Sequence, residues 1–220
     1  AVGVVSSLMA IIQAVGFFFG HGSGNYISRQ LGRHETADAE KMAATGVTLA
    51  FLAGCVILVL GQIFLSPLAR LLGSTDTILP YARSYLRIIL LGAPYMTASF
   101  VLNNQLRFQG SAAYAMVGIT SGAVLNIALD PIMIFWMDLG VAGAAWATII
   151  SQFAGFCLLL AGCTRGATLH IHISRVQLKW SYFKLIIQGG LPSLARQSLA
   201  SVATICLNHA AMPYGDAAIA

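Results

Sequence analysis

The segment GITSGAVLNIALDPIMIF (118–135) is apolar enough to cross a membrane, yet it contains an amide, a carboxylate and a proline close together. Gly118, Gly122, Asn126 and Asp130 are spaced four apart, which places them on one face of a helix. The two glycines at the start of this face predict close contact with a neighbouring helix. The face ends in the amide and the carboxylate, and ionisable groups inside a membrane usually have a function.

Pro131 follows the carboxylate and has no N–H to donate, so the carbonyl of Ile127 should lose its helical hydrogen bond. A carboxylate, an amide and a free carbonyl within one helical turn can hold a proton, Na⁺ or a cationic ligand. We therefore predict an ion- or substrate-binding site at Asn126 and Asp130, shaped by the two glycines and the proline. The alternative is that Asn126 only joins two helices and that Asp130 caps a helix at the membrane edge.

The composition of the 220-residue chain indicates an integral membrane protein. Hydrophobic residues make up 58% of the sequence and charged residues 9%, a balance far from that of soluble domains. The net charge of +5 does not indicate nucleic-acid binding, because the basic residues gather in short connections between apolar segments. The cysteines lie in or at the ends of apolar segments without paired or metal-binding spacing, so we expect no disulfide, no metal site and no cofactor.

Six apolar segments predict an all-α fold of membrane-spanning helices, since each is near the length of about 20 residues that crosses the hydrocarbon layer. They cover residues 1–22, 42–65, 88–106, 112–136, 141–163 and 186–209. The polar stretch 28–41 is expected to be a connection in which a helix starts near Thr36. The chain begins inside an apolar segment and ends at a polar turn, so we expect it to be part of a longer protein.

Further polar residues are candidates for binding. Arg196 and Gln197 lie within the sixth apolar segment, where an unpaired guanidinium is costly, so Arg196 should face a cavity or a carboxylate. The sequence does not say whether that carboxylate is Asp130. Asn103 and Asn104 could contact a substrate, but a short capped connection explains them equally well.

Basic residues also predict the orientation in the membrane. Eight lie in connections on one side, namely Arg29, Arg33, Lys41, Arg107, Arg165, Arg175, Lys179 and Lys184. The other side has three, namely Arg70, Arg83 and Arg87. Because positive charge is retained in the cytoplasm, we expect the first group to be cytoplasmic.

Four motifs in this order resemble the MATE family of multidrug and toxin extrusion transporters, especially its bacterial branch similar to DinF and MepA. They are GHGSGNYISRQLGR (20–33), LNNQLRFQG (102–110), GAVLNIALDPIMIF (122–135) and GVAGAAWATIISQ (140–152). The turn YGDAAIA (214–220) looks like the lead into the eighth helix of that family. Trp146, where smaller apolar residues are common, is a minor departure.

The resemblance implies a fold of twelve helices in two six-helix lobes, of which this chain holds helices two to seven. Residues 1–163 would then form most of the N-terminal lobe. Residues 164–185 would be a cytoplasmic linker between the lobes, and residues 186–220 the start of the C-terminal lobe.

The resemblance also implies the function. It predicts efflux of lipophilic, often cationic compounds across the bacterial cytoplasmic membrane, by antiport with H⁺ or Na⁺ and alternating access, in a protein that acts as a monomer. In the family, acidic and amide groups of an N-lobe cavity bind the coupling ion, and Asp130 and Asn126 are the matching positions here. The expected partners are a small drug or toxic cation and the lipid bilayer.

Three other functions are weighed against this one. A flippase for lipid-linked oligosaccharide, from the same superfamily, would line its cavity with several basic residues, whereas only Arg196 lies within an apolar segment. An intramembrane aspartyl enzyme would need a second carboxylate within a predicted span, and this sequence has none there. A metalloprotease would need the motif H-E-x-x-H, which is also absent from this sequence. A membrane scaffold without transport activity would show no ion-driven efflux.

Overall fold

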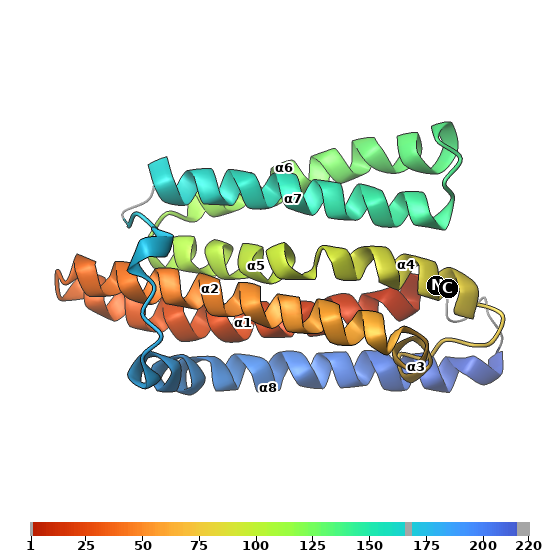
Figure 1. Cartoon of the computed structure of the whole chain (residues 1–220), viewed down its shortest axis with the longest axis horizontal. Helices are drawn as coiled ribbons and strands as arrows, with labels where there is room; N and C mark the ends of the chain where they lie inside the picture. Colours follow the sequence, from red (N-terminus) through yellow and green to blue (C-terminus); the bar gives the residue numbers. More distant parts are fainter. Residues whose placement is uncertain (1, 166–168, 215–220) are drawn as a thin grey trace.

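The computed structural model describes residues 2–165 and 169–214, and these form a bundle of long helices that run along one axis (Figure 1). The helices α1, α2 and α5 lie in the middle of the bundle in this view, α6 and α7 cover one side, and α8 covers the other. The α-helices are α1 (Val2–Gly32), α2 (Thr36–Ile63), α3 (Leu65–Leu71), α4 (Leu79–Leu91), α5 (Ala93–Phe108), α6 (Ala112–Pro131), α7 (Val141–Arg165) and α8 (Trp180–Ala211). Three short elements complete the fold, namely η1 (Ile132–Trp136), η2 (Ile173–Arg175) and η3 (Met212–Tyr214).

The all-helical membrane fold predicted from the sequence is confirmed. Within the described residues, four helices are long and apolar enough to cross a membrane, and a bent pair of helices adds a fifth candidate span. The fourth predicted segment agrees with the structure at both ends, because α6 and η1 together cover residues 112–136. The sixth lies within α8, which is 32 residues long but is not among the helices that are sufficiently apolar to span by composition.

The third predicted segment differs from the structure in its start. The pair Leu79–Leu91 and Ala93–Phe108 is bent by 56° at Gly92, whereas the sequence placed the start of the span at residue 88. Pro94 lies in the first turn of α5, just after Gly92, where its missing N–H breaks no helical hydrogen bond. The bend therefore divides this candidate span into the helix α4, which has one apolar face, and the more buried helix α5.

The predicted connection 28–41 is mostly helical. The helix α1 continues to Gly32 and α2 begins at Thr36, as the polar start of that segment indicated. His34 between them has a φ of 62°. The polar residues at the end of α1 therefore lie on a helix that continues beyond its apolar part.

Close packing of α1 against α5 comes from a regular pairing of small and large residues. Gly16, Gly20 and Gly24 face the side chains of Phe100, Asn104 and Phe108, respectively. A Cβ at any of these glycines would lie 2.9 Å or less from the facing side chain. Small residues at a spacing of four thus bring two spans into close contact, as is common within membranes.

The bundle exposes apolar side chains along α2 and along α6, as expected for helices of a membrane protein. Large exposed side chains on these helices include Phe51, Val56, Leu60, Val117, Val124 and Ile127. By contrast, α1 has the largest buried share of the four helices that qualify singly as spans. The helix α1 packs against α2, α5 and α8, whereas α6 and α7 pack against each other and against α5.

The helix α8 lies along α1 with its backbone in direct contact. A Cβ at Gly190 would lie 2.2 Å from the carbonyl oxygen of Phe18, and one at Gly22 would lie 2.3 Å from that of Ile186. At the other end of α8, the buried Asn208 Nδ2 donates to the carbonyl of Gly3 at 3.1 Å. The same nitrogen also lies 3.1 Å from Ser7 Oγ and 3.2 Å from the Leu72 carbonyl.

We expect the substitution Asn208→Ala to destabilise the protein by about 2 kcal/mol, because it removes hydrogen bonds that join three buried segments. Thermal unfolding of the purified protein measures the change. Asn25→Ala is the control, because the exposed Asn25 side chain donates no hydrogen bond within the described residues. Equal melting temperatures for the two variants would contradict the structural role of Asn208.

The predicted linker 164–185 is shorter in the structure, because α8 already begins at Trp180. The helix starts earlier than predicted because Trp180 and Phe183 pack their rings against each other and Tyr182 is buried. Residues 166–168 of this linker lie outside the described residues. So does all of the YGDAAIA turn after Tyr214.

Candidate functional site

A cavity of about 490 Å³ lies among α1, α5, α6 and α7. Most of its polar lining consists of uncharged amides and hydroxyls, and Arg107 is the one charged residue among the described residues that line it. The polar residues are Gln13, Ser99, Asn103, Asn104, Asn126, Thr148, Ser151 and Gln152. Phe17 and Phe100 add an aromatic wall, with ring centroids 5.7 Å apart. Such a mixed lining suits a compound with an aromatic body and a few polar groups.

The helix α5 supplies two amides whose orientation is fixed by the backbone. Asn103 Nδ2 donates to the carbonyl of Ala115 on α6 at 3.0 Å, and Asn104 Nδ2 donates to the carbonyl of Phe100 at 2.8 Å. Because the nitrogens are engaged, the side-chain oxygens remain as acceptors. The substrate role that the sequence left open for these two residues agrees with their place in the cavity wall.

The predicted pair Asn126 and Asp130 comes together in the C-terminal half of α6. Asn126 Nδ2 lies 3.4 Å from Asp130 Oδ1, and both side chains are partly buried. Asn126 lines the cavity, whereas Asp130 lies one turn further along the helix and is not part of its wall. The amide of Asn126 therefore connects the carboxylate to the cavity.

The helix around this pair has the features that the sequence indicated. Gly118 and Gly122 face α7, where an added Cβ would lie 2.5 Å from Leu159 and 3.3 Å from the carbonyl of Ser151. Pro131 is the last residue of α6 and is followed by a π-helical turn, Ile132–Trp136. Single π-helical turns within membrane helices often accompany functional sites.

The other two predicted site residues lie on α8. Gln197 Nε2 donates to Gln13 Oε1 at 3.2 Å, and Gln13 belongs to the cavity wall. Arg196 is exposed, is not part of that wall, and forms no ion pair with any described carboxylate. The expectation that Arg196 faces a cavity or a carboxylate is therefore not met in this structure, because its side of α8 faces away from α1. The helices α6 and α8 lie on opposite sides of the bundle, so Asp130 and Arg196 are not neighbours (Figure 1).

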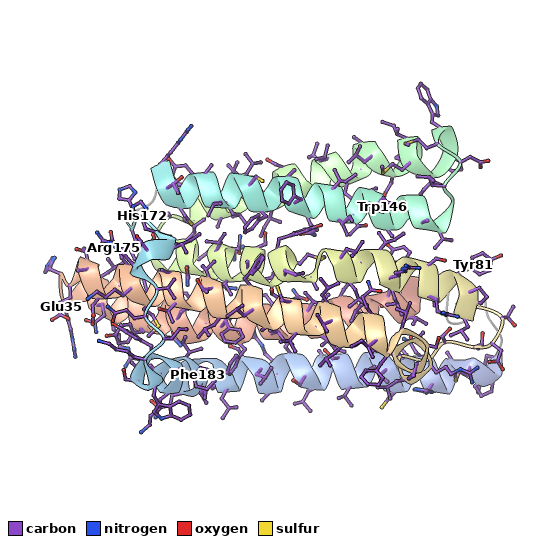
Figure 2. The ribbon with its side chains drawn as sticks, in the orientation of Figure 1. Glu35, Tyr81, Trp146, His172, Arg175 and Phe183 are labelled. Carbon is purple, nitrogen blue, oxygen red and sulfur yellow. The ribbon has the colours of Figure 1, made fainter. Side chains whose placement is uncertain are left out.

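Several cavity residues were not singled out by the sequence. Gln13, Ser99 and Thr148 each lie in an apolar helix. Of the three, Gln13 gave the clearest sequence indication of a binding site, because amide side chains are rare within apolar helices. Periodicity alone could not assign them to one site, since the wall is built from four helices that are distant in sequence. Trp146, the departure from the family pattern, is partly exposed on α7 and is not part of the wall (Figure 2).

A second polar cluster, the linker cluster, joins the start of α8 to the start of α2 at the opposite end of the bundle from Tyr81 (Figure 2). Tyr26 and Tyr182 both donate hydrogen bonds to the carboxylate of Asp38, at 2.7 and 3.0 Å. Arg175 forms an ion pair with Glu40. Thr45 Oγ1 accepts from the Gln177 N–H at 3.1 Å. These contacts hold the segment before α8 against α2.

Together, the candidate spans and the polar cavity among them define a multi-pass helical membrane protein. The family model described as MatE matches residues 1–132, and the chain belongs to this family of transporters, which are not enzymes. The resemblance carried by the four motifs is confirmed.

Known relatives extend the match to the whole chain. The multidrug export protein MepA of Staphylococcus haemolyticus is 30% identical over 221 residues, which cover 100% of this chain and 49% of the relative. An inward-facing structure of a MATE family transporter superposes with a TM-score of 0.91 at 29% identity, covering 99% of this chain and 50% of the other. A ligand complex of the multidrug transporter DinF-BH gives a TM-score of 0.90 at 33% identity, covering 97% and 48%. The chain thus spans about half the length of these relatives.

Proposed function

We propose that the intact protein exports lipophilic, often cationic compounds in exchange for H⁺ or Na⁺ by alternating access. The observation that carries this proposal is the position of Asn126, which lines the cavity and also contacts Asp130. A compound in the cavity and an ion at the carboxylate can therefore influence each other through one side chain. Family membership supports the same function, since the similar MepA and DinF-BH proteins are a multidrug export protein and a multidrug transporter.

In the proposed mechanism, the ionised carboxylate of Asp130 attracts a cationic compound from the cytoplasmic side. Binding of H⁺ or Na⁺ from outside neutralises the carboxylate and so favours release of the compound. Coupling requires that both ligands bind the two conformations with different affinity. Reloading on the cytoplasmic side then needs Asp130 to be ionised again.

We further propose that residues 1–163 form most of the first lobe and that α8 begins the second. In this arrangement, the hydrogen bond from Gln197 to Gln13 crosses between the lobes next to the cavity. This hydrogen bond would break when the two lobes move apart. Because its acceptor, Gln13, lines the cavity, we assign Gln197 to the binding site. Arg196 is assigned to the same site only in a conformation that turns it toward the cavity.

The proposed location is the bacterial cytoplasmic membrane, with the protein acting as a monomer. The described parts of the connections 28–41, 107–112 and 164–185 lie at the end of the bundle that carries most basic residues, which supports a cytoplasmic position for them. The aromatic side chains of Trp136 and Trp180 are exposed at opposite ends, as is common where helices leave the hydrocarbon layer.

The test is ethidium efflux from proteoliposomes that contain the intact protein, driven by an imposed H⁺ gradient or by an imposed Na⁺ gradient. We expect efflux with one of the two gradients and none in their absence. A lipid-linked oligosaccharide flippase or a scaffold would give no ion-driven efflux in this assay. That result would overturn the proposal.

We expect the substitution Asn126→Ala to lower the concentration of the coupling ion needed for half-maximal efflux by up to about tenfold, because the amide N–H stabilises the ionised carboxylate and its loss makes neutralisation by the ion easier. The ion dependence of ethidium efflux measures the change. Thr120→Ala on the same helix is the control, since Thr120 is exposed and outside the cavity wall. An unchanged ion dependence in the Asn126 variant would remove the amide from the ion site.

A further inference from the structure

A second concave surface, the outer groove, lies at the end of the bundle that carries fewer basic residues. It has a volume of about 460 Å³ and is formed by the end of α2, the start of α3 and one side of α4. Arg83 and Arg87 of α4 line it together with the polar side chains of Gln62 and Ser66. The two arginines are four residues apart, so their side chains lie on the same face of the helix.

The positive charge of the outer groove has no counterpart in the protein. Among the described residues, no carboxylate lies within 4.0 Å of the guanidinium group of Arg83 or Arg87. The neighbouring Arg70 pairs with Asp76 at 3.0 Å, and Asp76 is the one acidic residue between α2 and α4. Two adjacent guanidinium groups without a carboxylate repel each other, so an anion between them is favoured.

Hydrogen bonding keeps this surface available. Gln62 Nε2 donates to the backbone carbonyl of Arg87 at 2.8 Å, which fixes the amide at the edge of the groove. The Ser84 hydroxyl, on the same helix, donates to the carbonyl of Pro80 and does not engage an arginine. Within the described residues neither guanidinium group donates a hydrogen bond, and the planar geometry of the group matches a phosphate.

The surroundings place the outer groove at the membrane boundary. The α2 span ends at Ile63, and the side chains of Ile63 and Phe64 beside the groove are 67% and 55% exposed. Tyr81 on α4 is 59% exposed at this end of the molecule (Figure 2). Exposed tyrosines are enriched where a membrane protein meets the lipid headgroups. The groove thus has apolar side chains on one side and two cations at headgroup depth.

We propose that the outer groove binds the phosphate of an anionic phospholipid from the adjoining leaflet, with the acyl chains lying along Ile63 and Phe64. The two guanidinium groups of Arg83 and Arg87 contact the phosphate oxygens. This binding also accounts for two basic residues at the end of the protein where positive charge is otherwise scarce. It does not depend on the proposed transport activity.

The test is native mass spectrometry of the intact protein in detergent, titrated with phosphatidylglycerol, phosphatidylcholine or uncharged diacylglycerol of equal chain length. We expect the tightest binding for phosphatidylglycerol and the weakest for diacylglycerol. Replacing Arg83 or Arg87 by Gln should weaken phosphatidylglycerol binding about fivefold, and replacing both about twentyfold. Arg70→Gln removes the same charge from a paired arginine nearby and should leave this binding unchanged.

Three results would overturn the proposal. Equal binding of phosphatidylglycerol and diacylglycerol by the unmodified protein would show that the phosphate is not recognised, and this comparison needs no variant. An equal loss in the Arg70→Gln variant would show that binding follows general surface charge. Complete displacement of phosphatidylglycerol by millimolar inorganic phosphate would identify a site for free phosphate instead.

Discussion

The substitution Asp130→Asn is expected to reduce ion-driven ethidium efflux to the level of protein-free liposomes. Asparagine has nearly the shape of aspartate but cannot exchange a proton or offer a full negative charge to Na⁺. The side chain is partly buried and the hydrogen bond that it accepts from Asn126 is long, at 3.4 Å, so folding should be affected by less than about 1 kcal/mol. Efflux and thermal unfolding are measured on the same preparation.

Asp138→Asn is the matched control for this prediction. Asp138 follows shortly after the same helix, is exposed and has a φ of 51°, a conformation that asparagine also tolerates. The variant carries the same charge change and should transport normally. Normal efflux by the Asp130 variant would show that the carboxylate is dispensable, and the exchange mechanism would then lack its site.

The substitution Gly190→Ala is expected to destabilise the protein by about 3 kcal/mol, because the new methyl group would overlap the backbone of α1. Its Cβ would lie 2.2 Å from the Phe18 carbonyl oxygen, and a backbone atom cannot move aside as a side chain can. We expect a lower unfolding temperature in detergent and a smaller monodisperse fraction in size-exclusion chromatography.

Gly32→Ala is the control for packing, since no atom lies within 4 Å of a Cβ at this position at the end of α1. Alanine is favoured over glycine in helices by up to about 1 kcal/mol, so this variant should be at least as stable as the unmodified protein. If Gly190→Ala were equally stable, the direct contact between α8 and α1 would be wrong.

The sequence predicted the all-helical membrane fold because the evidence for it is local. Continuous apolar segments of membrane-spanning length require helices, whatever their partners are. The helix ends were less accurate for a physical reason as well. Apolarity marks only the part of a helix inside the membrane, whereas α1 continues through polar residues to Gly32. The bend at Gly92 likewise depends on how α4 and α5 pack against neighbouring helices, which composition alone does not show.

The candidate site was predictable where its residues share one helix. Asn126 and Asp130 are four apart, so helical geometry alone brings them together. Arg196 could not be placed in this way. Its position in an apolar segment says that it lies at membrane depth, but the direction of its side chain depends on which face of α8 packs against α1. The cavity wall was hidden for the same reason, because it forms only when four helices converge.

The linker cluster also determines where α8 is free to change direction. Asp38, Glu40 and Thr45 hold the approach to this helix, and Asn208 anchors its far end to α1 and α3. Between the two anchors lies the sequence Gly189–Gly190–Leu191–Pro192. Glycine makes a helix more flexible than other residues do, and Pro192 has no N–H for the backbone hydrogen bond of the helix. This short stretch therefore has the lowest helix propensity between the two tethered ends, and a bend of α8 would cost least free energy here.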